Sequence, residues 1–500
     1  MQYPAIILAI AAFFSSNPAN PAWITYADNP SIVYQGRWDK SQLSSPWCGW
    51  QGSSVAMNFD GTAIAMGVIV ANDNEWFKVI VDGDVFNAKE VEVSSNNILQ
   101  VVILAHGLTA GAHHIEVVKE TNNNEHMTFL GFAGIDGIGP LAPPLPHSRR
   151  IAFYGDSNLA GNSLEHEENN GQLSYRGCTN TFAGITARRF DAAYQNCSIS
   201  GATISSLNSW YDRVNPSDEN TQWSFSNWVP DVVVINIGAN DIYSYSESRI
   251  RTRYNNLLDD MRVTYPNAHI VMANGRGWDK DEPADYIENV VAQRNDPNMS
   301  AVIFPWVFEQ WHGCETDHSG MADLVSEHIA TVMGWTASPT DVMTGFGRGG
   351  NVANGSFEES APFGGFGWRY GVNKPGVHRL YAPAIAQDGE YFVGVLSGGS
   401  IQQANPCQPG QTVTVNLWLR SRHATGAALA DITLDFRNQE MYTAPLSSNS
   451  FTLLARPTWT NHTVTAIAPV GADPIFHTRL TIAPNGQSEV AIDNVTMTIN

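Results

Sequence analysis

The sequence predicts a multidomain protein in which a central α/β domain lies between two β-sandwich domains. Strand-like and helix-like segments alternate over residues 148–335, which is typical of a parallel sheet with right-handed crossovers. On both sides of this region, short segments of alternating polarity are separated by turn residues, as in antiparallel sandwiches. Changes in composition at 139–146 and 338–350 mark the domain boundaries.

Length and charge narrow the class of protein. A chain of 500 residues is too long for a single hydrophobic core and suggests about three domains. With 27 Lys and Arg against 48 Asp and Glu, the net charge of −21 argues against nucleic acid or an anionic membrane as a partner. The balance of few basic and many small polar residues suits a secreted, mainly β protein.

Residues 1–22 are predicted to be a signal peptide, which implies an extracellular protein. The apolar run 5–14 is too short to cross a bilayer, and Ala19 and Ala22 offer cleavage sites. The alternative is a hydrophobic N-terminal strand, because no Lys or Arg precedes the run. No later segment has the length of a transmembrane helix.

The five cysteines leave at least one thiol without a partner in the same chain. Cys178 and Cys197 flank a short helix-like stretch and are the favoured disulfide. The alternative is a set of five reduced, buried thiols.

The first sandwich is predicted over residues 25–138, with clear strands at 77–83 and 114–119. The following segment, 139–146, is rich in proline and can form neither a helix nor a central strand. It is interpreted as a stiff connector to the central domain.

In the central domain, the apolar run 151–154 breaks at Gly155-Asp156-Ser157. This pattern indicates a buried strand that ends in a tight turn and raises a serine at its carboxyl end, where open α/β sheets place their chemistry. Asp156 and Asp241 are interpreted as turn and cap residues rather than catalysts.

Three further blocks follow strands of the central domain in order. Gly201 follows a short second strand, and Asn240 follows the unbroken β-branched run 232–235. His318 lies in the block 313–320, just before a helical pattern. Between them the sequence predicts helices at 249–265 and 284–294 and strands at 269–273 and 301–304.

Serine, glycine, asparagine and histidine at strand ends in this order resemble the SGNH, or GDSL-type, hydrolases. The resemblance covers roughly 148–335 and implies an α/β three-layer SGNH hydrolase fold. It also implies Ser157 as nucleophile and His318 as its base. The implied oxyanion donors are the backbone N–H groups of Ser157 and Gly201 and the side-chain amide of Asn240.

The acid of this group is ambiguous. In the family an Asp stands three residues before the histidine, a position held here by Glu315, while Asp317 is adjacent to the histidine. Glu315 is favoured, Asp317 is the alternative acid, and a backbone carbonyl that orients the ring would leave a Ser–His dyad. His312 and His328 are interpreted as packing or surface residues. No ligand motif indicates a metal or other cofactor for catalysis.

Several phrases of the first sandwich resemble the jelly-roll domain of two-domain acetylxylan esterases within the SGNH group. They include residues 36–38, 81–83 and 129–132. Those esterases also share the block 313–318, which here is one residue longer and lacks the usual proline after the histidine.

The third domain, predicted over 351–500, resembles the family 4/9 type of carbohydrate-binding module at both its ends, 351–358 and 491–496. That resemblance implies a structural calcium, with Glu358 and Asp493 as candidate ligands. The candidate sugar-binding aromatics, which are alternatively core residues of the sandwich, are Trp368, Tyr370 and Trp459.

These features lead to one favoured function and two alternatives. The favoured function is a secreted serine esterase that removes O-acetyl groups from a polysaccharide through an acyl-enzyme, with an acetylated polysaccharide or other ester as its partner. The alternatives are an SGNH lipase or arylesterase acting on lipid or small esters, and a non-catalytic glycan-binding protein. The sequence does not specify the glycan or the position of the acetyl group.

Overall fold

The computed structural model describes 22–85, 88–121, 126–165, 171–242, 244–275, 282–304, 312–338, 352, 355–358, 368–370, 376–423, 425–437, 444–471 and 477–500. Within it the chain forms two compact units, each described by itself. The first unit comprises 1–160, 176–179 and 191–270, and the second comprises 161–175, 180–190 and 271–500. The predicted signal peptide lies outside the described residues, apart from its last residue, Ala22, which begins β1.

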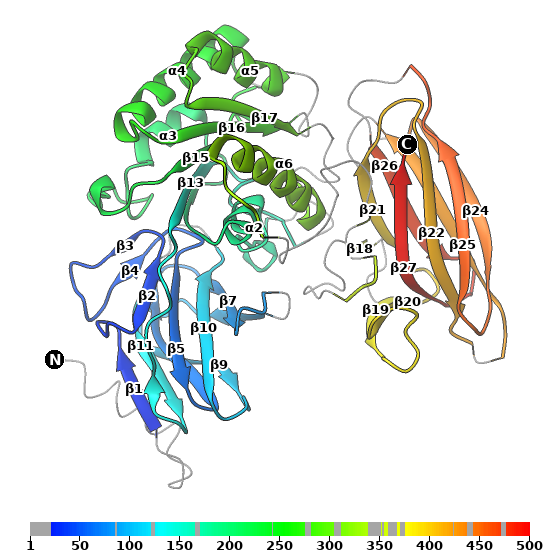
Figure 1. Cartoon of the computed structure of the whole chain (residues 1–500), viewed down its shortest axis with the longest axis horizontal. Helices are drawn as coiled ribbons and strands as arrows, with labels where there is room; N and C mark the ends of the chain where they lie inside the picture. The colour runs from blue at the N-terminus through cyan, green and yellow to red at the C-terminus, as the bar shows by residue number, and fades with distance from the viewer. Residues whose placement is uncertain are drawn as a thin grey trace. The chain divides into compact units, whose positions relative to one another are not determined.

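An N-terminal sandwich of two antiparallel sheets opens the chain (Figure 1). Its facing side chains form one aromatic and aliphatic core that includes Phe59, Phe77 and Phe129, all of them fully buried. The first sheet has the order β3 (Trp38–Asp39), β4 (Trp47–Cys48), β11 (Met127–Ile135), β6 (Ala63–Val70) and β9 (Gln100–His106), with β1 (Ala22–Tyr26) on β11. The second has the order β12 (Gly139–Pro140), β5 (Ser54–Asp60), β10 (Ala112–Lys119), β7 (Glu75–Val81) and β8 (Lys89–Val93), with β2 (Ile32–Gln35) on β5.

The proline-rich connector starts inside this sandwich rather than after it. Its first two residues form β12, an edge strand on β5, and the Leu141 N–H donates to the Asn58 carbonyl at 2.8 Å. Proline is tolerated there because an edge strand need not donate toward solvent. The sheet thus continues into the first residues of the connector.

The central sheet has the order β14 (Ala192–Ser198), β13 (Arg149–Gly155), β15 (Val232–Asn236), β16 (His269–Gly275) and β17 (Met299–Phe304). β13 pairs in parallel with both β14 and β15, which confirms the parallel sheet expected from the alternation of strands and helices. The helices are η1 (Leu173–Tyr175), α2 (Phe182–Arg189), α3 (Ile204–Trp210), η2 (Phe225–Asn227), α4 (Glu247–Thr264), α5 (Glu282–Arg294) and α6 (Glu315–Met333). α3 packs on α4 in the first unit, and α2 packs on α6 in the second.

A second antiparallel sandwich ends the chain, as the alternating polarity of strands such as β22 predicted. Its core includes Phe357, Trp368 and Leu417. One sheet has the order β18 (Arg369–Tyr370), β21 (Ile401–Pro406), β26 (His477–Pro484), β23 (Ala428–Arg437) and β24 (Ser447–Ala455). The other has the order β19 (Val377–Tyr381), β20 (Tyr391–Val395), β27 (Val490–Ile499), β22 (Thr412–Ser421) and β25 (Thr460–Ile467).

All five cysteines are buried free thiols, so the predicted Cys178–Cys197 disulfide is wrong and the alternative of reduced thiols holds. The Cys178 thiol instead donates to the carbonyl of Lys119 at 3.3 Å. Burial raises the pKa of Cys197 to about 11, which makes it an inert core residue.

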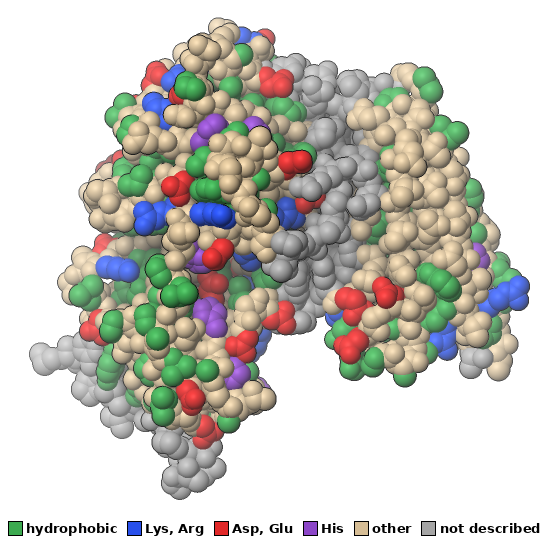
Figure 2. Space-filling model, in the orientation of Figure 1, with side chains coloured by type: hydrophobic (Ala, Val, Ile, Leu, Met, Phe, Trp, Pro, Cys, Tyr) green, Lys and Arg blue, Asp and Glu red, His purple; other side chains and the backbone are tan. Residues whose placement is uncertain are grey.

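The surface agrees with the charge argument. On the face drawn in Figure 2, Lys and Arg side chains of the described residues are scattered and form no continuous patch. Among the described helices, none combines the length and apolar character needed to cross a membrane.

Candidate active site

The turn after β13 raises Ser157 at the carboxyl end of the strand. Gly155, the last residue of β13, pairs with Ser198 of β14 and Asn236 of β15. A Cβ at Gly155 would lie 2.3 Å from the Asn236 carbonyl oxygen, so only glycine fits there. Ser157 is partly exposed, whereas both of its neighbours in the chain are buried. Ser157 is thus a partly exposed residue between two buried neighbours.

Asp156 shapes this turn, as predicted. Its Oδ1 accepts a hydrogen bond from the Asn158 N–H at 3.1 Å, and the residue is 1% exposed. Burial raises the pKa of this carboxyl to about 7, and the nearby Asp241 adds to the rise. A buried carboxyl that bonds its own turn serves the backbone geometry of Ser157.

The two other oxyanion candidates lie at the same edge of the sheet, which we call the carboxyl edge. Gly201 follows β14, is exposed and has a φ of +80°, which favours glycine. Asn240 follows β15, and its Nδ2 donates to the Ala202 carbonyl at 2.9 Å. This bond ties the two loops together and fixes the direction of the asparagine amide.

Asp241 holds the same edge in place. Its Oδ2 accepts a hydrogen bond from the Ile204 N–H at 3.0 Å, at the first residue of α3, and its Oδ1 pairs with Arg253 at 2.7 Å. The residue is fully buried. Its predicted role as a cap is confirmed.

The candidate acids lie in the first turn of α6. The buried Asp317 Oδ2 accepts a hydrogen bond from the Cys314 N–H at 2.9 Å, which is a capping contact at the start of the helix. The Glu315 Oε1 accepts one from Asn180 Nδ2 at 3.0 Å. The Cys314 thiol also donates to Asp317 Oδ2, at 3.4 Å.

His318 is enclosed by backbone groups. The N–H of Phe182, at the start of α2, donates to Nδ1 at 3.1 Å, so this nitrogen carries no proton. The proton of the neutral ring is then on Nε2, which lies 3.2 Å from the His312 carbonyl oxygen and donates to it. The ring stacks on Phe182, is 1% exposed, and burial lowers its pKa to about 3. These are the contacts of a histidine that joins α2 to α6.

His312 lies in the same unit and precedes α6. It is 8% exposed, and Asn162 Nδ2 lies 3.5 Å from its Nδ1 and 3.4 Å from its Nε2. Its carbonyl, rather than its ring, accepts the bond from His318. Sequence reasoning interpreted this histidine as a packing or surface residue. The signal that it missed is that His312 is the first histidine after β17 along the chain.

The structure therefore brings together Ser157, Gly201 and Asn240 in the first unit, and the two histidines with Glu315 in the second.

The third domain gives a mixed result for the predicted sugar-binding aromatics. Trp368 is 6% exposed and packs on Phe357 inside the core, so it cannot stack on a sugar from solvent. Trp459 is half-buried, lies against Phe392 and donates to the Ile385 carbonyl at 2.6 Å. The side chain of Tyr370 lies outside the described residues.

The predicted calcium ligands both bind one loop. The Glu358 Oε1 accepts hydrogen bonds from the N–H groups of Glu390 and Tyr391, each at 2.9 Å. The Asp493 Oδ2 accepts from Gln387 N–H at 2.8 Å. Calcium takes about 6–8 oxygen ligands, and the described part of the chain holds no group of three or more His, Cys, Asp or Glu that could bind a metal. The structural calcium implied by the resemblance therefore stays a prediction.

A serine on a glycine turn at the carboxyl edge of a parallel sheet, beside a left-handed glycine and an anchored asparagine, defines a GDSL-type hydrolase domain. In agreement, residues 153–307 match the GDSL-like Lipase/Acylhydrolase family, and 34–144 match the Carbohydrate esterase 2 N-terminal domain. A solved family two carbohydrate esterase from Clostridium thermocellum, in complex with cellohexaose, is 31% identical with a TM-score of 0.56, over 61% of this chain and 99% of that one. The chain belongs to carbohydrate esterase family 2.

Two curated relatives extend the comparison. The "Cellulase/esterase CelE" of Acetivibrio thermocellus is 33% identical over 62% of this chain, and the match spans 40% of that protein's length. An "Acetylxylan esterase / glucomannan deacetylase" of Cellvibrio japonicus is 23% identical over 62% of this chain and 91% of its own length.

Proposed function

We propose that this protein is a carboxylic ester hydrolase that removes acetyl groups from a neutral polysaccharide through an acyl-enzyme. The observation that carries the proposal is the partly exposed Ser157 on its glycine turn, with Gly201 and Asn240 at the same edge. The names of the relatives, which mention acetylxylan and glucomannan, support an acetylated plant glycan as substrate. A polysaccharide substrate also supports action outside the cell.

In this mechanism the Ser157 hydroxyl attacks the acetyl carbonyl while a base takes its proton. The developing oxyanion is stabilised by the N–H groups of Ser157 and Gly201 and by the amide of Asn240. One N–H of that amide already binds Ala202, so the second N–H is the one assigned to the oxyanion. The base then protonates the departing sugar hydroxyl, and water, activated by the same base, releases acetate.

The contacts of the two histidines favour His312 as that base. A general base needs one ring nitrogen that can accept a proton from the serine. In His318, Nδ1 is occupied by the Phe182 N–H and Nε2 carries the proton given to the His312 carbonyl. His312 comes after β17 in the chain, and its bond with His318 uses its backbone carbonyl rather than its ring. We therefore assign the base to His312 and a positioning role to His318.

The alternative of a lipase or arylesterase makes a different prediction for substrate choice. The decisive experiment measures acetate release from acetylated xylan and glucomannan beside p-nitrophenyl esters of increasing chain length. We expect the wild type to deacetylate the glycans, and we expect Ser157→Ala to keep its fold but lose this activity. Turnover that grows with acyl length, or that persists in a highly purified Ser157→Ala protein, would refute the proposal.

We also propose that the third domain is a glycan-binding module, as its sandwich architecture supports. Deleting residues 351–500 should then leave turnover of small soluble esters nearly unchanged and weaken action on insoluble polysaccharide, because a tethered module raises local concentration. Equal losses on both kinds of substrate would show that the domain instead stabilises the rest of the chain.

A further inference from the structure

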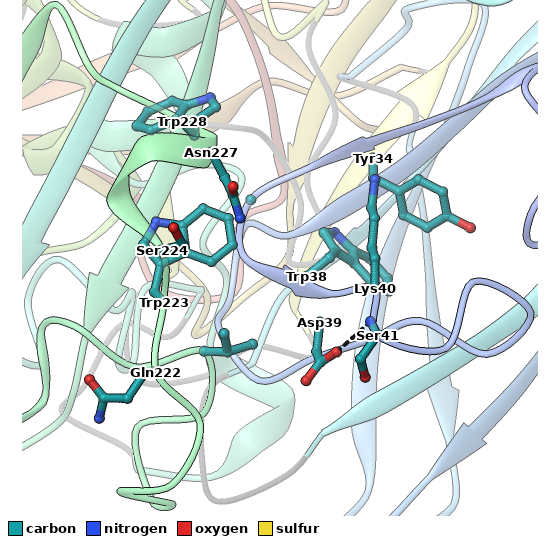
Figure 3. A pocket seen from close by; sticks show the side chains of 12 residues that line it. Tyr34, Trp38, Asp39, Lys40, Ser41, Gln222, Trp223, Ser224, Asn227 and Trp228 are labelled. Atoms are coloured by element: carbon teal, nitrogen blue, oxygen red, sulfur yellow. Dashed lines mark hydrogen bonds between the residues drawn. The ribbon is translucent and has the colours of Figure 1, made fainter.

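A cavity of about 510 Å³ lies in the first unit, between the N-terminal sandwich and a loop of the central domain (Figure 3). Its volume falls within the range of about 300–1,000 Å³ of small-ligand sites. One wall is the segment around β3, with Tyr34, Trp38 and Lys40. The opposite wall is the loop that carries Trp223 and Trp228. Nothing in the proposed reaction uses these residues.

Ser157, Gly201 and Asn240 are not among the residues that line the cavity. The loop of Trp223 and Trp228 leads into the amino end of β15, where the Asp231 N–H donates to the Arg150 carbonyl at the start of β13. Ser157 lies beyond the opposite end of β13, a strand of 7 residues. At about 3.3 Å per residue, the two ends of this strand are roughly 20 Å apart. The loop that carries Trp228 therefore leads to the end of β15 opposite the carboxyl edge.

The lining combines aromatic faces with exposed polar groups. Trp223 and Trp228 are half-buried, whereas Gln222, Asn227 and Ser41 are exposed. In Figure 3, Asn227 and Trp223 lie on one side of the cavity, with Trp38 and Asp39 on the other. A pyranose ring also has an apolar and a polar part, namely a face of C–H groups and a rim of hydroxyls. Aromatic rings match the first, and amide, hydroxyl and carboxylate groups match the second.

The charges around the cavity favour a neutral ligand. Lys40 is one cation beside Asp39, and the Lys40 Nζ lies 4.2 Å from the centre of the Tyr34 ring. A single cation offset by a carboxylate does not make an anion site, and the net charge of −21 repels anionic polymers.

The walls are held in place before any ligand arrives. The guanidinium of buried Arg37, next to Trp38 in the chain, donates to the Tyr211 and Arg213 carbonyls at the base of the opposite loop. Arg37 Cζ also lies 5.6 Å from the centre of the Trp223 ring, a cation–π contact. A cavity fixed in this way loses little entropy on binding.

From these observations we propose that this cavity is a second glycan-binding site, which takes a neutral sugar chain through Trp223, Trp228 and Asn227. Its ligand class is that of the proposed substrate, but its binding does not depend on ester hydrolysis. It would hold a glycan at a distance from Ser157 and so raise the local concentration of acetyl groups at the carboxyl edge.

The test is calorimetric titration of the full chain with xylohexaose, cellohexaose and mannohexaose. Trp228→Ala and Asn227→Ala should weaken binding of at least one of these sugars by about tenfold, as expected for the loss of roughly 1.4 kcal/mol. Turnover of p-nitrophenyl acetate should stay unchanged in both variants. Trp47→Ala is the control: Trp47 is half-buried like Trp228 and lies on β4 of the sandwich that forms the opposite wall, but it does not line the cavity.

The outcomes separate this site from the esterase site. A sugar bound at the esterase site inhibits p-nitrophenyl acetate turnover competitively, and that inhibition should be the same in Trp228→Ala as in the wild type. Binding that is equal in all variants would overturn the proposal, as would a loss of binding matched by a loss of turnover. Because Asn227 is exposed, its variant keeps the test valid if Trp228→Ala proves unstable.

Discussion

Replacing the two histidines one at a time should separate structure from catalysis. His318→Ala removes a ring that pairs with the Phe182 N–H and the His312 carbonyl, and leaves both backbone groups buried without it. Each buried group left without its hydrogen-bond partner costs about 1–3 kcal/mol. Together with the cavity that the ring leaves behind, the variant should lose about 3–5 kcal/mol in free energy of unfolding. A change of this size should lower the melting midpoint by roughly 6–20 °C.

His312→Ala should have the opposite pattern. The bond between the two residues uses the His312 backbone carbonyl, which alanine keeps, so the melting midpoint should fall by only a few degrees. Loss of the base should lower kcat for p-nitrophenyl acetate by about 10⁴-fold or more.

Both variants are compared by thermal melting and by initial rates well below the lower midpoint. The expected pattern is a folded, inactive His312→Ala and a destabilised His318→Ala that retains much of its kcat. A His318→Ala protein with the wild-type midpoint and no activity, beside an active His312→Ala, would refute the assignment of roles.

Three further predictions follow from the contacts at the carboxyl edge and at α6. Asn240→Ala should lower kcat by roughly 10²–10³-fold with little change in KM if its second N–H stabilises the oxyanion as proposed; a change confined to KM would indicate substrate positioning instead. Burial raises the pKa of the Asp156 carboxyl from its ordinary 3.8 to about 7 in the folded state. The protonated carboxyl therefore contributes its full stability below about pH 4. This contribution, about 4 kcal/mol, is lost as the pH rises to 7. Asp156→Asn should therefore gain stability relative to the wild type over this range, and urea midpoints that run parallel from pH 4 to pH 8 would contradict the burial argument. Asp317→Ala removes the cap on the Cys314 N–H and should lower the free energy of unfolding by about 0.5–2 kcal/mol. The kcat of this variant should stay within about tenfold of the wild type. A loss of kcat as large as that of His312→Ala would identify Asp317 as the catalytic acid.

The strands of the central domain could be predicted because their signal is local. The β-branched run 232–235 lies within β15, and the apolar run 151–154 lies within β13. The helix predicted at 249–265 is α4, observed at Glu247–Thr264. In each case the pattern of a single segment was enough to predict the element. A parallel strand buried on both faces has an unbroken apolar run, and a helix buried on one face has apolar residues at helical spacing.

The contacts of His318 could not be predicted in this way. One nitrogen of its ring accepts from the Phe182 N–H, at the start of a helix far away in the sequence. The helical pattern after His318 was recognised, but α6 begins at Glu315, so His318 and Asp317 lie within its first turn rather than before it. The cavity between Trp38 and Trp223 was missed for the same reason, since its two walls come from segments with no common pattern.

The buried Arg37 also links the folding of two regions that the sequence separates by a proline-rich connector. Its guanidinium bonds Gln195 Oε1 and the Tyr154 hydroxyl on strands of the central sheet, besides the two carbonyls of the loop. Trp50 of the sandwich adds a bond to the Arg213 carbonyl at 2.9 Å. If the sandwich unfolded alone, these acceptors would lose their donors inside the central domain. The two regions should therefore melt as one cooperative unit, and a chain cut at the connector should not yield a stable hydrolase fragment.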